Sequence, residues 1–272
     1  MDSIEYVKVT SNLKRLLLRL RDYEEWGTFW IDSICINQED VEERSEQVQL
    51  MSGIYSMAQN VLIWLGEEDD QTAKAFKCVQ SLIDLRDLPF GEAPWHRLTV
   101  EQGRNENQTA PFILPLNLRG ITALDKDEWD AFVGLFKRPW FHRIWVFQEV
   151  VMASDAVVLC GELSLPWDAL HAGCKIVESS QIYRNNPRRW SCLPALNMAT
   201  IRKSIINAKK GSNPDLWNAV MAELIFEKLL RQTRSAQATD PRDKVYALLS
   251  LAIGDEKIMP KPDYSSVSND LI

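Results

Sequence analysis

Signature motifs of several large enzyme classes are missing from this 272-residue chain. It contains no GxGxxG after a strand-like run, no GxxxxGK followed by Ser or Thr, no GxSxG turn and no HExxH helix. These absences remove sequence support for a Rossmann dinucleotide site, a P-loop, a serine-hydrolase elbow and a zincin-type metal helix.

Cysteine and histidine are few and scattered. The five cysteines contain no CxxC pair, and none of the three histidines is paired at ligand spacing. An odd, dispersed set of cysteines favours reduced thiols in an intracellular protein over a disulfide framework. We therefore expect no metal site and no resident cofactor.

An excess of basic charge is also lacking, because 31 Lys and Arg are outnumbered by 38 Asp and Glu. This balance argues against a nucleic-acid partner, which needs clustered cations to neutralise its phosphates. No apolar run approaches the roughly 20 residues that span a bilayer, and the N-terminus does not read as a signal peptide. We expect a cytoplasmic protein with no membrane or nucleic-acid partner.

Three short apolar runs predict buried strands, at residues 28–37, 61–66 and 156–161. Segments with helical periodicity separate these runs, and such alternation is typical of βαβ units. We therefore predict an α/β fold with a parallel sheet flanked by helices. Residues 4–9 alternate weakly and predict a short edge strand.

The chain is predicted to fall into two parts. Residues 1–178 form the α/β domain, interrupted at about 86–124 by an insertion that lacks periodicity and contains several prolines. Residues 179–272 form a helical C-terminal extension packed on that domain, with helices expected at about 196–209, 216–232 and 245–252.

The segment at 138–153 carries the first candidate for chemistry. Pro139 suits the first position of a helix. One helix face then carries residues at i, i+3, i+4 and i+7: Trp145, Gln148, Glu149 and Met152. Glu149 is either a partly exposed acid beside a core tryptophan or a carboxylate kept in a cleft to do chemistry. Asp32 raises the same question, because a carboxylate inside a buried strand must be paired, capping or functional.

Four segments together resemble the fungal heterokaryon incompatibility (HET) domain. They are residues 30–47, with the run Trp-Ile-Asp-Ser-Ile-Cys-Ile-Asn-Gln; 61–66, Val-Leu-Ile-Trp-Leu-Gly; 138–149; and 240–250, which begins Asp-Pro-Arg-Asp-Lys. The resemblance implies an intracellular domain used in non-self recognition and programmed cell death between incompatible fungal strains.

The HET family in turn looks like a distant relative of TIR domains. That relation implies a flavodoxin-like fold and, as in several TIR members, cleavage of NAD⁺ by one glutamate on the third helix. The segment from Trp145 to Glu149 is similar to the TIR pattern of a Trp followed four residues later by Glu. Carried over, Glu149 is the catalytic carboxylate, and NAD⁺ is a substrate.

The residues are suited to this chemistry. Cleavage of the nicotinamide–ribose bond develops oxocarbenium character, which a carboxylate in a low-dielectric cleft stabilises. Trp145 and Trp30 are candidates for stacking on a nicotinamide or adenine ring. Asp32 and Arg143 are secondary candidates for polar contacts with the dinucleotide, and each is equally consistent with a helix cap or an ion pair.

HET domains usually begin with a strand carrying the pattern Tyr-x-Ala-Leu-Ser-Tyr-x-Trp-Gly, and this chain has no such segment before its first helix. The sheet is therefore expected to lack the usual first strand, unless the chain is a truncated variant or residues 4–9 or another chain supply it.

Three functions stay open: a TIR-like NAD⁺ hydrolase, a non-catalytic signalling module that assembles with copies of itself or a partner protein, and a diverged family member that acts on an unrelated small molecule.

Overall fold

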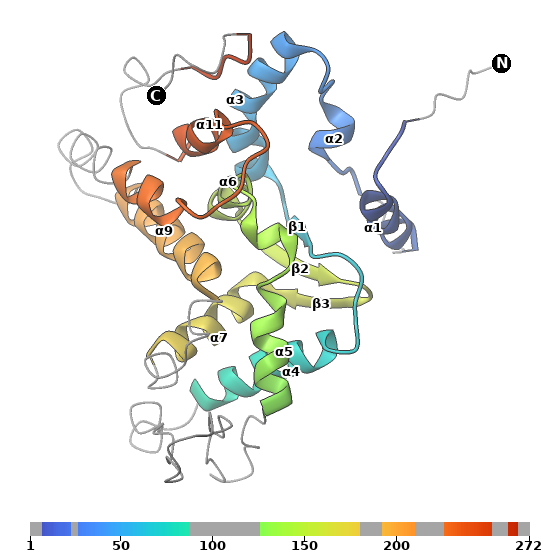
Figure 1. Ribbon diagram of the computed structural model, residues 1–272, viewed down its shortest axis with the longest axis vertical. Helices are drawn as coiled ribbons and strands as arrows, with labels where there is room; N and C mark the ends of the chain where they lie inside the picture. The colour runs from blue at the N-terminus through green and yellow to red at the C-terminus, as the bar shows by residue number, and fades with distance from the viewer. Residues whose placement is uncertain are drawn as a thin grey trace, which may run out of the picture.

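The computed structural model describes residues 7–22, 27–86, 126–179, 192–209, 226–251 and 261–265. At its centre lies a three-stranded sheet in the order β1-β2-β3, with helices around it (Figure 1). The α/β class predicted from the sequence is confirmed. The predicted insertion lies almost wholly outside the described residues, and so does the first half of the edge strand predicted at 4–9. The described half forms no strand.

β1 (Val61–Trp64) and β2 (Ala156–Cys160) are two of the strands predicted from the sequence, and they pair in parallel. β3 (Leu163–Pro166) pairs antiparallel with β2, so the sheet is mixed and the prediction of a parallel sheet is wrong at this edge. The sequence pattern does not reveal β3 because Leu165 alone is buried in it. Gly161 makes the turn before β3 with a φ of +54°, which favours glycine.

The buried strand predicted at 28–37 does not form. Its first half has no regular structure, and its second half contains α2 (Asp32–Cys35), a single helical turn whose amides donate to the carbonyl of Ile31. The run is not buried either, because Phe29 is 46% exposed and Ile34 is 38% exposed. An acidic residue favours the start of a helix, and this local preference outweighs the β propensity of its neighbours.

α1 (Ser11–Asp22) and α3 (Val41–Met57) flank that run in the sequence, and α3 is one of the helical segments predicted between the strand-like runs. Asp40 caps α3, accepting hydrogen bonds of 3.0 Å from two amides of its first turn. Arg19 ties α1 to the sheet by donating to carbonyls around the β2–β3 turn. No strand precedes β1 in the described part of this N-terminal region.

The single helix predicted over residues 138–153 is two pieces. A 3-10 helix, η2 (Pro139–His142), is followed by extended backbone at Arg143 and then by α6 (Val146–Met152). The break arises because the chain here pairs with Gln237. The amide that follows Arg143 donates to the carbonyl of Gln237 at 2.9 Å, where a continuous helix would bond within itself.

The remaining helices surround the sheet (Figure 1). They are α4 (Thr72–Arg86), α5 (Lys126–Leu135), α7 (Trp167–Ser179), α9 (Leu193–Lys209) and α11 (Asp243–Leu249). In Figure 1, α4 and α5 lie side by side below the sheet, and α3, α6 and α11 gather above it. Residues 226–232, the described part of the helix predicted at 216–232, are helical.

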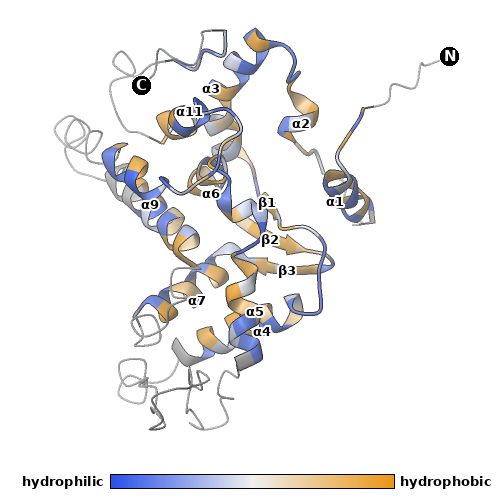
Figure 2. Cartoon of the chain, in the orientation of Figure 1, coloured by the Kyte–Doolittle hydropathy of each residue, from blue (hydrophilic) through white to orange (hydrophobic). Residues whose placement is uncertain are grey.

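Apolar side chains of the sheet and helices form one continuous core, which extends into α9 and the C-terminal residues. Figure 2 shows how strongly hydrophobic the strands are. A second, smaller cluster joins α3 to α11 and to the chain near its C-terminus: Val48, Met51, Tyr246 and Tyr264. The division of the chain at 178/179 into two domains stays a prediction.

Candidate functional site

Glu149 lies in the first turn of α6, and its Oε2 accepts a hydrogen bond of 3.2 Å from the indole nitrogen of Trp140. The break after η2 makes this contact, because residues nine apart lie about 180° around the axis of a continuous helix. Glu149 as a residue is half-buried, but its carboxyl group is enclosed by protein. Burial raises the pKa of Glu149, against the opposing charge of Arg143; Asp32 raises it further, and the Trp140 hydrogen bond lowers it.

Tyr55 of α3 completes the cluster around Glu149. Burial raises the pKa of its phenol far above the usual range, the charges of Glu149 and Asp32 raise it further, and Arg143 acts in the opposite direction. The phenol therefore stays neutral at physiological pH. Trp30 packs edge-on against Tyr55, with 5.8 Å between the ring centroids. Segments far apart in the sequence thus meet at one enclosed carboxyl group.

A pocket of about 590 Å³ opens beside this cluster. Asp32 at the start of α2 and Trp145 at the start of α6 line it, together with one face of α3, the turn before α11, and Tyr264. Glu149 is not one of the lining residues, although Trp145 lies one helical turn before it. The pocket has the size of a small-molecule site, and its walls combine aromatic rings with charged groups.

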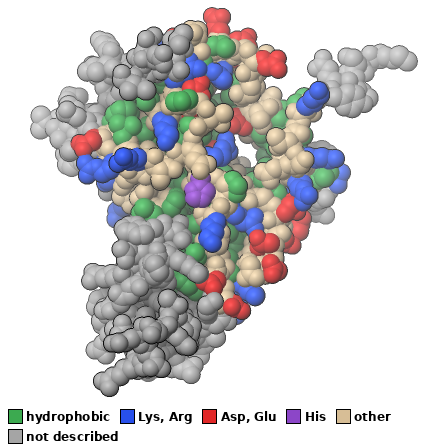
Figure 3. Space-filling model, viewed as in Figure 1, with side chains coloured by type: hydrophobic (Ala, Val, Ile, Leu, Met, Phe, Trp, Pro, Cys, Tyr) green, Lys and Arg blue, Asp and Glu red, His purple; other side chains and the backbone are tan. Residues whose placement is uncertain are grey.

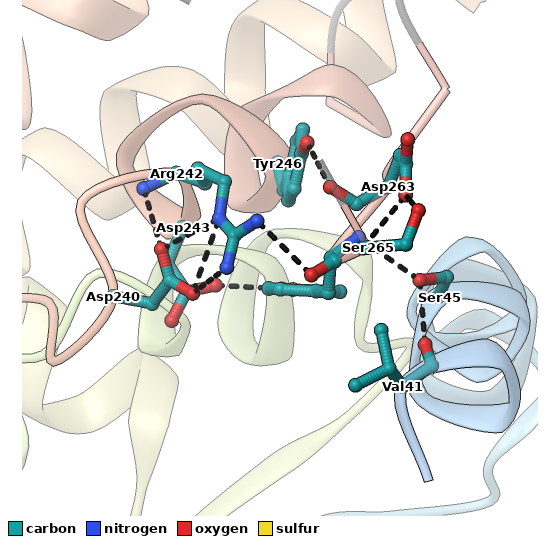
Figure 4. Close-up of polar contacts among 9 residues, drawn as sticks. Val41, Ser45, Asp240, Arg242, Asp243, Tyr246, Asp263 and Ser265 are labelled. Carbon is teal, nitrogen blue, oxygen red and sulfur yellow. Dashed lines mark hydrogen bonds and ion pairs between the residues drawn. The ribbon is translucent and has the colours of Figure 1, made fainter. Parts of the chain in front are cut away.

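Figure 4 shows the polar contacts between the turn before α11 and residues 261–265, which form one wall of the pocket. Arg242 holds Asp240 with a fork of hydrogen bonds, 2.7 Å from Nη2 to Oδ2 and 3.0 Å from Nε to Oδ1, which lowers the pKa of Asp240. The hydroxyl of Tyr264 donates to Asp243 at 2.6 Å. Burial nevertheless raises the pKa of Asp243, against the hydrogen bonds from Tyr264 and Trp145. Asp240 is therefore firmly ionised, whereas Asp243 is shifted toward its neutral form.

The structure brings three of the five residues singled out from the sequence into one electrostatic cluster around Tyr55: Asp32, Arg143 and Glu149. Trp30 reaches this cluster through the ring of Tyr55. Trp145 lines the neighbouring pocket. The roles of these residues in binding and catalysis stay predictions.

Sequence reasoning missed Trp140, Tyr55 and Arg44. Arg44 and Tyr55 are about three helical turns apart on α3, so they share a face with Val48 and Met51, and that periodicity was a usable signal. From the sequence, Arg44 enters only as part of the segment at 30–47 that resembles HET domains. Trp140 had no such signal, because its contact with Glu149 depends on the break in the helix.

The carboxyl end of β1, where ligands bind in many parallel sheets, is occupied by Arg138. Its guanidinium donates to the carbonyls of Leu65 at 3.1 Å and Glu67 at 2.8 Å, and to the side chains of Asp69 at 3.0 Å and Thr72 at 3.1 Å. A smaller pocket of about 360 Å³ lies beside it. Burial acts to raise the pKa of Asp69, but the hydrogen bond from Thr72 and the charge of Arg138 lower it overall. These contacts hold the loop after β1 in place.

The described residues give no sign of a metal site or of a membrane-spanning helix. Within those ranges, no group of His, Cys, Asp and Glu side chains is positioned to hold a metal ion. None of the described helices has both the length and the apolar character to cross a membrane. On the face drawn in Figure 3, the Lys and Arg side chains of the described residues are scattered among Asp and Glu side chains.

Comparison with known proteins gives two matches. A family model described as "Heterokaryon incompatibility protein (HET)" matches residues 2–149, which is more than half of the chain and ends at Glu149. "Heterokaryon incompatibility protein 6, OR allele" of Neurospora crassa is 27% identical over 277 residues, covering 96% of this chain and 40% of the relative. The chain thus spans about two-fifths of that relative's length. No solved structure matches significantly.

Proposed function

The chain belongs to the heterokaryon incompatibility (HET) protein family, and on that premise we propose that it acts in fungal non-self recognition and programmed cell death as a TIR-like NAD⁺ glycohydrolase. The name of the Neurospora relative supports the first part of this proposal. One observation carries the second part. The carboxyl group of Glu149 is enclosed, its pKa is raised by burial, and it is held by Trp140 next to Asp32, which reaches into a ligand-sized pocket.

In the proposed reaction, water replaces nicotinamide on the ribose of NAD⁺, giving nicotinamide, ADP-ribose and a proton. The bond to nicotinamide breaks with its electron pair leaving on the ring nitrogen, so positive charge develops on the ribose. The Glu149 carboxylate stabilises that charge, and the enclosed site makes this interaction stronger than it would be in water.

The neighbouring residues supply orientation and charge balance. Asp32 is placed at the boundary between pocket and cluster, where its carboxylate accepts hydrogen bonds from ribose hydroxyls. The charge of Arg143 favours the ionised form of Glu149 by opposing the effect of burial on its pKa. Trp145 lines the pocket and offers a ring face to the nicotinamide or adenine base. Trp30 packs against the ring of Tyr55 and contributes through that contact.

The test is release of nicotinamide from NAD⁺ by the purified chain, followed by chromatography. We expect turnover by the wild type and a loss of at least about a hundredfold in Glu149→Gln. Glu227→Gln is the matched control, because Glu227 is exposed and pairs with Arg231 one helical turn away. Equal turnover by the wild type and Glu149→Gln would remove Glu149 from the mechanism.

A second candidate is a non-catalytic module that assembles with copies of itself or with a partner protein. The observation that favours it is the absence of Glu149 from the lining of the pocket. Leu50 and Met57, two helical turns apart on α3, are 56% and 87% exposed and offer an apolar surface. Light scattering on the wild type and Leu50→Glu tests this candidate: self-association that the substitution abolishes, without NAD⁺ cleavage, favours it.

A further inference from the structure

Arg44 stands at an unusual position in the pocket. It is the fourth residue of α3, where the helix dipole favours acidic side chains and disfavours a cation. Glu42 and Glu43 on the same turn follow that preference. The positive charge of Arg44 at this position therefore does not serve to stabilise the helix.

The ring of Tyr264 fixes the guanidinium of Arg44. The Arg44 Cζ lies 3.8 Å from the ring centroid, a close cation–π stack. The Nε of Arg44 is enclosed, yet it has no hydrogen-bond partner among the described residues. A buried donor without a partner is costly, and in native proteins it commonly marks a missing water, ion or ligand.

The neighbouring charges leave Arg44 available for an anion. Arg242 is committed to Asp240 through its fork of hydrogen bonds. Asp243 accepts the hydroxyl of Tyr264, and burial shifts its pKa upward, toward the neutral form. Arg44 lowers the pKa of both carboxyl groups through space, but no ion pair within 4.0 Å joins it to either one in the described part of the chain.

We propose that Arg44 binds a phosphate group of a nucleotide held in the 590 Å³ pocket, with the ring of Trp145 facing the base and Asp32 facing the ribose. A planar guanidinium pairs with phosphate oxygens through two parallel hydrogen bonds, which a lysine cannot reproduce. An aspartate is a common acceptor for ribose hydroxyls. A nucleotide satisfies all three groups, whereas inorganic phosphate or a nucleoside satisfies only some of them.

The face of α3 connects this phosphate site to the proposed catalytic group. Arg44, Val48 and Met51 line the pocket, and Tyr55 follows one turn later beside Glu149. A nucleotide anchored at Arg44 would extend along this face toward Glu149. The inference deepens the proposed function and rests on it for the identity of the complete ligand, but phosphate binding is measurable without any cleavage.

The test compares AMP with adenosine, which differ only in the phosphate, by calorimetric titration of the full chain. We expect the wild type to bind AMP about ten- to a hundredfold more tightly than adenosine. Arg44→Gln is expected to bring the affinity for AMP down to that for adenosine. Arg15→Gln is the matched control, because Arg15 is exposed on α1 and pairs with Glu67, and it should keep the wild-type preference.

Arg44→Lys guards against a folding defect, since it keeps a positive charge beside the ring of Tyr264. We expect it to bind AMP at least about threefold more weakly than the wild type while its melting temperature stays unchanged. A wild type with no preference for AMP, or an Arg44→Gln variant that retains it, overturns the assignment. Because AMP has no nicotinamide to lose, this result is independent of NAD⁺ cleavage, and either proposal can fail without the other.

Discussion

Arg138 and Arg44 are two arginines with opposite surroundings. At the carboxyl end of β1, Arg138 makes four hydrogen bonds to the loop that follows the strand and to the first residue of α4. At the pocket between α2, α3 and α11, Arg44 stacks on Tyr264 and its Nε has no partner in the described residues. Satisfied polar groups stabilise a fold, whereas a buried group without a partner commonly marks the place of a water, ion or ligand. We infer that the edge of the sheet is structural and that the α3 pocket is functional.

The largest expected effect is on stability at Arg138. Arg138→Ala removes a charged donor from two carbonyls and two side chains, and we expect a loss of about 3 kcal/mol in the free energy of unfolding. Arg44→Ala should lose no more than about 1 kcal/mol, the value of a cation–π contact. Urea denaturation of both variants measures the difference, and equal losses would erase the contrast between the two regions.

Gly161→Ala tests the same structural region at the turn between β2 and β3, which approaches the loop after β1. The residue has a φ of +54°, and a Cβ here would lie 2.7 Å from the backbone nitrogen of Glu68. We expect the free energy of unfolding to fall by about 2 kcal/mol, because the left-handed conformation and the close approach both disfavour a side chain. Gly53→Ala, in the middle of α3 with no atom near the new Cβ, is the control and should be neutral or stabilising. A loss at Gly53 as large as at Gly161 would contradict the account.

Trp140→Phe tests the functional region. It removes the hydrogen bond to Glu149 and keeps most of the aromatic ring. We expect the free energy of unfolding to fall by about 1.5 kcal/mol. Because this hydrogen bond lowers the pKa of Glu149, its removal raises that pKa further. The acid limb of the pH profile of NAD⁺ cleavage should therefore move to higher pH. An unchanged acid limb would mean that the protonation of Glu149 does not control the rate.

The smallest effect, with the opposite sign, is expected for Glu149→Gln. The pKa of Glu149 is raised in the folded state, so its contribution to stability is present at low pH and is lost as pH rises through the folded pKa. An uncharged Gln avoids this loss. At neutral pH we expect the variant to be about 1 kcal/mol more stable than the wild type, with the gain disappearing in acid. Melting temperatures across pH measure it, and a neutral-pH loss of stability would contradict the assigned burial effect.

Sequence patterns predicted the parts of this fold that depend on local periodicity. The strands β1 and β2 and the helices α3, α4 and α9 follow their apolar patterns, and the HET resemblance is borne out by the family match. The parts that failed depend on distant partners. Gln237 breaks the helix before Glu149, and among the described residues no strand lies beside the segment at 28–37 to pair with it.

The candidate site shows the same limit. The sequence selects Glu149 by its place on an aromatic helix face and by the TIR-like resemblance, and Arg143 as a candidate for polar contacts with the dinucleotide. It selects Asp32 as a carboxylate in a predicted strand that does not form. Their meeting at Tyr55, and the hydrogen bond from Trp140 to Glu149, follow from tertiary packing. A residue can be selected by type and spacing, but the pKa of its carboxyl depends on neighbours that only the folded chain brings together.

Hydrogen–deuterium exchange of Glu149→Gln with and without NAD⁺ tests most directly where the ligand binds. The variant should bind the dinucleotide without cleaving it, and bound ligand slows exchange where it orders the backbone. We predict slower exchange in residues 41–57, 239–246 and 261–265, around the α3 pocket. Slower exchange confined to residues 65–72 and 134–139, at the carboxyl end of β1, would contradict the account.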